Sequence, residues 1–532
     1  MAAPAFAGAT YPVDDLYVRV DTKTPEDRAE INEMGLDILT VDLEKGSVWV
    51  RLPADELTDL LALPYNIEVL DVMAMPPAYE EYHSYAEQKA MLDDLHAQYP
   101  ELTKVFSIGP SYEGRELWAI KISNNPEVDD PEKPAFLLYA QHHAREILTP
   151  EVALYTAKTL LESYGVDDQM TTYVDTREVY IVPTVNPDGA EYDQSGATFR
   201  MWRKTRTVNE GSNCRGVDLN RNYGYEWVGP GSSGAPCSET YRGASPFSEP
   251  ETQALRKLIN THTNIRIDIS LHSHAKLVLY PWGYTYQKIA DQVDYQTHKT
   301  LAEAMAKFNK YTPAQASNLY PVNGDSGDWE YGEKGIIAYT IELEPSQLIV
   351  TGFYPQPSII QGACERNFQA ILLAIGLTRK PSLVLSTDLW RLEATLNGNA
   401  ATIHWNSIIE TKPQGWNVLR SEGASENYVQ LNDQLIQAGQ DDYTYIDQGL
   451  VEGTTYNYMV EYVAQNTNLN QQFGPVSVEM PGGADDDATD DDATDDDATD
   501  DDATDDDAAD DDATDDDAGD DDDNDDDSGC GC

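Results

Sequence analysis

The residues best suited to do chemistry lie in residues 140–151, which read A-Q-H-H-A-R-E-I-L-T-P-E. An apolar run at residues 135–139 indicates a buried strand before this segment, and the apolar spacing of residues 152–164 predicts a helix after it. His143 and Glu146 therefore stand where a strand ends and a helix is about to begin, which is where open α/β sheets build their sites. A histidine and a carboxylate three residues apart can both turn toward one metal ion.

A third ligand and a base come from two later strand-like runs. His272 directly follows the run I-R-I-D-I-S-L at residues 265–271, and Glu342 follows the run I-I-A-Y-T-I at residues 336–341. Two histidines, one carboxylate and an open water position are the pattern of a catalytic zinc site rather than a structural one. Glu342 could act as general base for a water molecule activated by the metal.

These segments, taken in order, resemble the signature of a known family. The matching segments are His143-Ala144-Arg145-Glu146, Asn220-Arg221, Leu271-His272-Ser273 and Glu342-Leu343. They resemble those of the zinc metallocarboxypeptidases of the carboxypeptidase A, B and T group, over residues 82–378. The resemblance implies an α/β catalytic domain with a mixed sheet and one Zn2+, acting on the C-termini of peptides and proteins. His142 is not taken as a ligand because only His143 has a glutamate three residues later.

The resemblance also implies roles for polar residues around the metal. Arg203 matches the arginine that stabilises the oxyanion, and a fixed guanidinium suits that task in a water-poor site. Asn220 and Arg221 match residues that hold the substrate's terminal carboxylate. Arg145 matches a further substrate-binding residue. Asp218 matches a carboxylate that orients His143 through its other ring nitrogen, although an ordinary surface aspartate is the alternative.

The segment N-L-Y-P-V-N-G-D-S-G-D-W at residues 318–329 resembles the family's loop for substrate capping and specificity. Tyr320 falls at the position of the mobile tyrosine that donates a hydrogen bond to the substrate. Gly327 stands where the carboxypeptidase B type has an aspartate, whereas Asp325 resembles the arrangement of the carboxypeptidase T type. That type accepts both apolar and basic C-terminal residues. The alternative is that Asp325 faces solvent.

Three of the five cysteines lie within residues 82–378. Cys214 and Cys237 flank the Asn220-Arg221 segment, where vertebrate members of the family have a disulfide, so the resemblance implies a Cys214–Cys237 bond and an oxidising compartment. Two reduced thiols are the alternative. Cys364 lies in a helical pattern at residues 359–375 and is expected to pack in the core.

The N-terminal part predicts a small separate module. Residues 11–72 give the order βαββαβ, with a hairpin signal around residues 44–46, and this order is typical of a ferredoxin-like α+β domain. It resembles the pro-segment of secreted carboxypeptidases, with residues 73–81 as the linker where proteolysis would release it. A permanently attached folding or binding module is the alternative. Further along, residues 179–182 predict a strand that leads into a tight turn at residues 186–189.

The C-terminal part changes character twice. Residues 385–481 are rich in strand patterns, and G-T-T-Y-N-Y resembles the tyrosine-corner strand of fibronectin type III β-sandwiches. Residues 484–532 repeat A-T-D-D-D, contain no apolar run able to form a core and predict a disordered stalk. The ending Gly529-Cys530-Gly531-Cys532 resembles an element found before bacterial surface-sorting segments, so attachment to a cell surface is a hypothesis for this tail.

Composition limits the remaining function classes. The chain has 532 residues and a net charge of −59, of which 28 charges come from aspartates in the tail, and this acidity argues against nucleic-acid binding. No apolar run approaches the length of a membrane helix. A-F-A within residues 1–10 resembles the end of a trimmed export signal. We expect a monomer that is secreted or held on a bacterial cell surface. Peptidoglycan stem-peptide hydrolysis and a non-catalytic surface-binding role are the alternatives.

Overall fold

The computed structural model describes residues 15–70, 76, 79–345, 352–382, 388–409, 413–425, 427–438, 442–464 and 470–481. The expected export-signal remnant and the Asp-rich tail lie outside the described residues, as do most residues of the expected linker. No helix within the described ranges combines the length and apolar character needed to cross a membrane.

The N-terminal residues form a four-stranded antiparallel sheet in the order β2-β3-β1-β4. Its elements are β1 (Asp15–Asp21), α1 (Pro25–Glu33), β2 (Asp37–Asp42), β3 (Ser47–Pro53), α2 (Leu57–Leu61) and β4 (Ile67–Leu70). Helix α1 begins at a capping box, in which Thr24 and Asp27 exchange hydrogen bonds, with Pro25 in the first turn where its missing N–H costs nothing. Alternating valines of β1 and β3 fill the small core.

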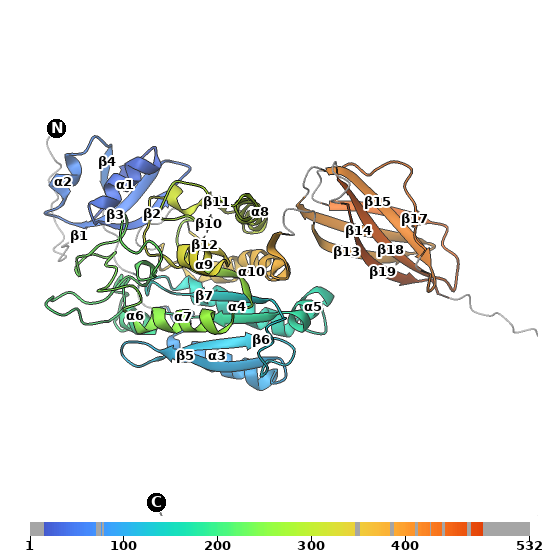
Figure 1. Ribbon diagram of the computed structural model, residues 1–532, viewed down its shortest axis with the longest axis horizontal. Helices are drawn as coiled ribbons and strands as arrows, with labels where there is room; N and C mark the ends of the chain where they lie inside the picture. Colours follow the sequence, from blue (N-terminus) through green and yellow to red (C-terminus); the bar gives the residue numbers. More distant parts are fainter. Residues whose placement is uncertain are drawn as a thin grey trace, which may run out of the picture. The chain divides into compact units, whose positions relative to one another are not determined.

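The central element is an eight-stranded mixed sheet in the order β11-β10-β12-β9-β7-β8-β6-β5 (Figure 1). Its strands are β5 (Thr103–Pro110), β6 (Glu116–Ile122), β7 (Ala135–Ala140), β8 (Glu178–Val182), β9 (Ile265–Ser273), β10 (Leu277–Tyr280), β11 (Thr312–Gln315) and β12 (Ile337–Leu343). Strands β8, β7, β9 and β12 run parallel, so their carboxyl ends meet at one edge of the sheet. The fully buried β7 has no charged side chain on either face, as expected for a covered parallel strand.

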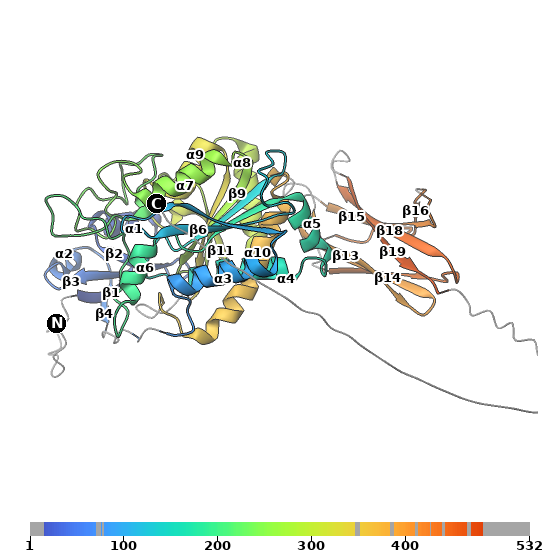
Figure 2. The same cartoon turned by 90° about the horizontal axis from the view of Figure 1, so that it is seen from below.

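Helices cover both faces of this sheet. In Figure 2, α7 (Pro250–Thr261) and α9 (Ser326–Lys334) lie on one side, and α3 (Tyr85–Gln98), α4 (Leu148–Glu162) and α10 (Ile360–Leu377) on the other. The remaining helices are α5 (Asp168–Thr176), α6 (Pro187–Gln194), α8 (Gln292–Asn309) and the short η1 (Leu219–Arg221), η2 (Ala316–Asn318) and η3 (Pro357–Ile359).

Two boundaries differ from the sequence prediction. Helix α4 begins at Leu148 rather than near residue 152, because Pro150 falls in its first turn, where a proline is tolerated. Residues 186–189 are not merely a tight turn but the start of α6, in which the Asn186 side chain accepts a hydrogen bond from the Gly189 N–H and Pro187 opens the helix.

Residues 388–481 contain two antiparallel sheets, in the orders β13-β14-β17 and β16-β15-β18-β19. Their strands are β13 (Asp388–Asn397), β14 (Ala400–Ile409), β15 (Pro413–Glu422), β16 (Val429–Gln430), β17 (Asp442–Gln448), β18 (Thr455–Ala464) and β19 (Gln471–Glu479). Aromatic side chains from both sheets pack into one core that includes Trp405, Trp416 and Tyr462.

Candidate metal centre and substrate cleft

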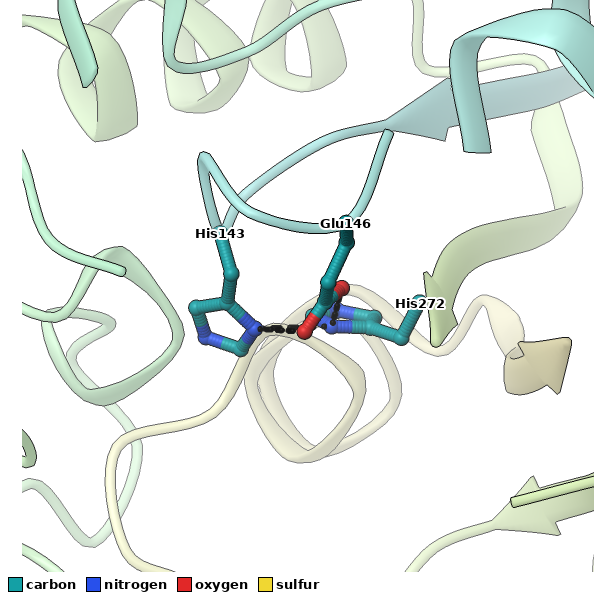
Figure 3. Close-up of side chains that lie close together, drawn as sticks. All are labelled: His143, Glu146 and His272. Carbon is teal, nitrogen blue, oxygen red and sulfur yellow. Dashed lines mark hydrogen bonds and ion pairs between the residues drawn. The ribbon is translucent and has the colours of Figure 1, made fainter. Parts of the chain in front are cut away.

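Three side chains meet at the carboxyl ends of the parallel strands. His143 and Glu146 lie in the loop between β7 and α4, and His272 stands on β9, the strand next to β7. Glu146 lies between the two imidazole rings (Figure 3), with Oε1 2.7 Å from His143 Nδ1 and Oε2 3.1 Å from His272 Nδ1. The two Nδ1 atoms are 3.2 Å apart. One ligand atom from each residue therefore lies close enough to share a metal ion.

The donor set fits zinc. All three side chains are buried, and burial opposes ionisation of Glu146, but the neighbouring histidines lower its pKa below the usual range. His143 Nε2 lies 3.0 Å from Asp218 Oδ1, so this nitrogen donates its proton and leaves the Nδ1 lone pair for a metal. Two imidazoles and one carboxylate are the ligands of many catalytic zinc ions.

Glu342 faces the same centre from the adjacent strand. In the parallel pairing of β12 with β9, Glu342 is the register partner of His272, so the sheet itself sets the two side chains next to each other. Both residues line the cleft. Burial and the charge of Glu146 raise the pKa of Glu342 to about 8. A carboxyl group in this position can take up and return a proton at neutral pH.

Asp218 connects the metal ligand His143 to the basic residues of the cleft. Its Oδ2 accepts hydrogen bonds from Arg203 Nε at 3.1 Å and Arg203 Nη2 at 2.8 Å. Its Oδ1 also accepts the Asn220 N–H at 3.0 Å, and Arg221 Nη1 lies 3.9 Å from Oδ2. Burial opposes ionisation, but Arg203 and Arg221 hold the pKa of Asp218 well below its usual range. Asp218 is therefore buried, and the alternative that it is an ordinary surface aspartate is wrong.

Arg145 has a partner that the sequence did not reveal. Its guanidinium makes two hydrogen bonds to Asp37 of β2, Nη1 to Oδ2 at 2.8 Å and Nη2 to Oδ1 at 2.9 Å. Burial alone would lower the pKa of Arg145, and the charge of Asp37 raises it instead. Arg51 of β3 also lies 3.4 Å from Asp37. An isolated aspartate at the start of an apolar strand carries no sequence signal for a contact made 108 residues away.

Strand β2 of the N-terminal sheet lines the cleft together with the metal ligands. The lining includes Ile38, Leu39, Thr40 and Val41 of β2. The Thr40 hydroxyl donates to the His274 carbonyl at 2.6 Å. Tyr320 also lines the cleft and packs against the N-terminal core. Arg28 fixes the preceding turn by donating to the carbonyls of Asn318 and Leu319.

Asp325 lines the cleft and is half-buried, so it is not an exposed surface residue. It caps α9, with Oδ1 accepting the Asp328 N–H at 2.8 Å, so its other oxygen is free of this bond. A Cβ at Gly283 would lie 2.5 Å from that oxygen, which explains why only glycine fits there. Burial raises the pKa of Asp325 to about 6. Leu279, Ala316 and Thr340 supply apolar surface nearby.

The cysteines and the two remaining histidines near the centre have other roles. Cys214 and Cys237 form the disulfide that the resemblance implied, with a Cα–Cα distance of 5.0 Å, and Cys364 is buried in α10. His142 stacks on His272 but directs Nε2 to the Tyr223 hydroxyl at 2.8 Å, so it stays outside the ligand set. His274 lines the cleft wall.

Comparison with known proteins agrees with this geometry. Residues 88–370 match the family model described as zinc carboxypeptidase. A "Zinc carboxypeptidase" of Saccharothrix mutabilis subsp. capreolus is 33% identical over 407 residues, covering 71% of this chain and 93% of the relative. Carboxypeptidase B of Bos taurus is 33% identical over 300 residues, covering 55% of this chain and 70% of the relative.

A solved structure is also similar. The crystal structure of thrombin activatable fibrinolysis inhibitor superposes with a TM-score of 0.57 and 26% identity, covering 69% of this chain and all of that one.

Proposed function

The chain belongs to the zinc carboxypeptidase family and is a metallocarboxypeptidase, and we propose that it removes both apolar and basic residues from peptide C-termini. The observation that carries the proposed preference is Asp325, a half-buried carboxylate that lines the cleft together with apolar side chains. We also propose that the N-terminal module inhibits the enzyme until proteolysis, and that the protein is exported.

His143, Glu146 and His272 would hold the zinc ion, because their ligand atoms converge and Asp218 fixes the tautomer of His143. Zinc bound there would supply a Lewis acid that polarises the scissile carbonyl and makes a water molecule more acidic. Glu342 accepts the proton of the attacking water and later passes it to the leaving amine. Its raised pKa suits a group that must take up and release a proton near neutral pH.

Arg203 and Arg221 provide positive charge on the substrate side of the cleft. Asp218 fixes Arg203 by two hydrogen bonds, so the guanidinium need not reorganise as negative charge develops on the carbonyl oxygen. Arg221 is held by its own bonds to the Gly231 and Asn220 carbonyls. With Asn220, it would bind the substrate's terminal carboxylate, and Tyr320 would close over the bound residue.

The side chain of the C-terminal residue would enter the space next to Asp325. Lysine or arginine would pair with the free oxygen of this carboxylate. An apolar side chain would contact Leu279 and Ala316 and leave Asp325 protonated, which its raised pKa makes easier. Gly327 adds no side chain next to Asp325, since a Cβ at this position would lie 3.6 Å from Asp325 Oδ1.

Residues 11–72 would act as an inhibitory pro-segment with a ferredoxin-like fold. Support comes from the βαββαβ order, from β2 along the cleft wall and from the ion pair between Asp37 and Arg145. Because Arg145 is assigned to substrate binding, its ion pair with Asp37 keeps it from contacting a substrate. Proteolysis within residues 73–81 would free it.

The remaining parts would support an extracellular role. We assign residues 385–481 to a fibronectin type III-like sandwich that binds or spaces, and residues 484–532 to an acidic stalk for cell-surface attachment. The Cys214–Cys237 disulfide fits export into an oxidising compartment. We propose that the enzyme acts as a monomer.

The test is hydrolysis of blocked dipeptides ending in Phe, Leu, Arg, Lys or Glu, before and after limited proteolysis at residues 73–81. Zinc is removed by a chelator and then restored. Glu342→Gln should lower kcat by about 10³-fold with unchanged zinc content, whereas the exposed Glu333→Gln serves as control. Release of neither Phe nor Arg by the zinc-loaded, cleaved enzyme would overturn the proposed specificity. Cell-wall stem peptides would then be the next substrates to assay.

A further inference from the structure

Two buried carboxyl groups lie outside the metal centre, on the face of the sheet covered by α9. Asp268 stands on β9, four residues before the metal ligand His272, and Glu330 stands on α9. Neither side chain has measurable exposure. Within the described ranges, neither forms an ion pair with an arginine or lysine. Carboxyl groups are rarely fully buried without an ion pair to a basic residue. We therefore expect Asp268 and Glu330 to have a function.

The two groups act on each other. Neither oxygen of Asp268 makes a well-formed hydrogen bond, and the polar groups that act on it are the Glu330 carboxyl and the Tyr339 amide. Burial, followed by the charge of Asp268, raises the pKa of Glu330 well above its usual value. Burial likewise raises that of Asp268. Adjacent carboxyls in an apolar interior cannot both ionise, so the pair retains a shared proton.

Glu330 continues into a chain of hydrogen bonds that ends at the substrate cleft. The Tyr139 hydroxyl lies 2.8 Å from each Glu330 oxygen and 3.0 Å from Ser326 Oγ. Ser326 is the first residue of α9, and its N–H donates to Asn220 Oδ1 at 3.0 Å. Asp325, the cap of the same helix, directly precedes it.

We propose that Glu330, next to Asp268 and hydrogen-bonded to Tyr139, is a positioning residue that fixes the first turn of α9 and thereby Asn220 and Asp325. The inference rests on the proposed function of these two residues. Asn220 serves every substrate, because all of them carry a terminal carboxylate, whereas Asp325 serves basic substrates in particular. A displaced first turn therefore raises KM for all substrates and raises it most for those ending in Arg or Lys.

The proton shared by Asp268 and Glu330 makes the positioning of α9 depend on pH. The titratable groups around Glu330 are Asp268 on β9, Tyr139 on β7, Tyr223 next to η1, and Asp325 and Asp328 on α9 itself. None of them is a cation, so loss of the shared proton leaves two carboxylates that repel each other. KM should then rise at alkaline pH, as α9 is pushed from the sheet.

The experiment compares Tyr139→Phe, Glu330→Leu and Glu330→Gln in the zinc-loaded, cleaved enzyme, with substrates ending in Arg and in Phe. Tyr180→Phe is the matched control, since Tyr180 is equally buried and also bonds a carboxylate, Glu178, but lies on β8 away from the cleft. Tyr139→Phe and Glu330→Leu should raise KM about 5- to 20-fold for the Arg substrate and less for the Phe substrate. Glu330→Gln should rescue KM, because an amide can accept from Tyr139 and donate to Asp268.

The outcomes separate positioning from simple destabilisation. A smaller folded fraction lowers the apparent kcat equally for both substrates and leaves KM and the Arg-to-Phe ratio unchanged, and that result would overturn the proposal. The proposal would also be overturned if KM of Glu330→Gln still rises at alkaline pH. If Glu330→Leu does not fold, the KM values of Tyr139→Phe for the two substrates decide whether the proposal holds. Inactivity of the wild-type enzyme on every substrate would instead refute the proposed function.

Discussion

Asp37 of β2 and Arg145 of the β7–α4 loop form a buried, two-pronged ion pair across 108 residues of chain. Arg145 is fully buried, and Asp37 is 6% exposed. The pair ties the N-terminal sheet to the loop that also carries His143 and Glu146. Inhibition by this sheet and access to the cleft would therefore depend on the same contact.

Asp37→Asn should increase hydrolysis by the intact chain several-fold. Removing one partner of a buried ion pair leaves the other charge uncompensated, a loss of about 3–5 kcal/mol that favours release of the N-terminal sheet. The measurement is kcat/KM of the uncleaved protein. Asp42→Asn is the control, because Asp42 lies on the same strand but pairs with the exposed Lys45 and not with a residue of the catalytic domain that the structure describes. If Asp37→Asn and wild type are equally inactive before cleavage and equally active after it, the ion pair has no inhibitory role.

Asp218→Asn should weaken zinc binding by about 10- to 100-fold, because the amide cannot match the carboxylate as acceptor for His143 Nε2. It should also lower kcat, since Arg203 loses its charged partner. Competition with a chelator measures the zinc affinity. Asp193→Asn is a suitable control, because Asp193 is also buried but binds Tyr354 and the Trp202 amide. Zinc affinity within twofold of wild type would contradict the assigned role of Asp218.

Asp325 should make the preference for basic residues depend on pH. Burial raises its pKa to about 6, so the carboxyl is neutral below that pH and charged above it. The ratio of kcat/KM for Arg-ending to Phe-ending substrates should rise about tenfold as pH increases from 5 to 7, because a charge-assisted hydrogen bond becomes available. The ionisation of Glu342 affects both substrates and cancels in the ratio. A flat ratio in wild type, or an equally steep one in Asp325→Asn, would exclude Asp325 as the determinant.

The sequence was sufficient to predict the catalytic sheet and the grouping of the metal ligands. His143, His272 and Glu342 each stand at or near the carboxyl end of an apolar run, and parallel strands bring such ends together. The βαββαβ order predicted for residues 11–72 likewise includes α1. These features depend on local pattern and on one rule of sheet topology, so a single sequence contains enough information for them.

Contacts between distant segments were not predictable in the same way. Asp37 and Arg145 meet only because the N-terminal sheet docks on the cleft, and nothing in the sequence around Asp37 marks it as the partner of Arg145. Asp268 was hidden in a run read as an apolar strand, and its partner Glu330 lies on a separate helix. Helix α4 was expected to begin near residue 152 because the apolar spacing starts there, but it begins at Leu148, with Pro150 in the first turn, where a proline is tolerated.

The buried Glu251 of α7 offers a test of stability that is independent of catalysis. Its Oε1 accepts the Tyr112 N–H at 2.9 Å, but Oε2 has no hydrogen-bond partner among the described residues. Burial raises its pKa from 4.5 to about 8, and the nearby charges of Glu249 and Asp188 act in the same direction. Between these pH values the folded state therefore binds more protons than the unfolded state, and stability falls as pH rises.

Glu251→Gln should remove this penalty while keeping the acceptor for Tyr112. The expected gain in the free energy of unfolding is about 1–3 kcal/mol at pH 7.5. It should be several-fold smaller at pH 5, because the carboxyl is protonated in the folded state there and pH 5 lies only about half a unit above its pKa of 4.5 in the unfolded chain. Thermal unfolding of wild type and variant at both pH values measures it, with Glu251→Ala as the variant that also loses the hydrogen bond. An equal shift in Tm at pH 5 and pH 7.5 would show that the gain does not come from the titration of Glu251.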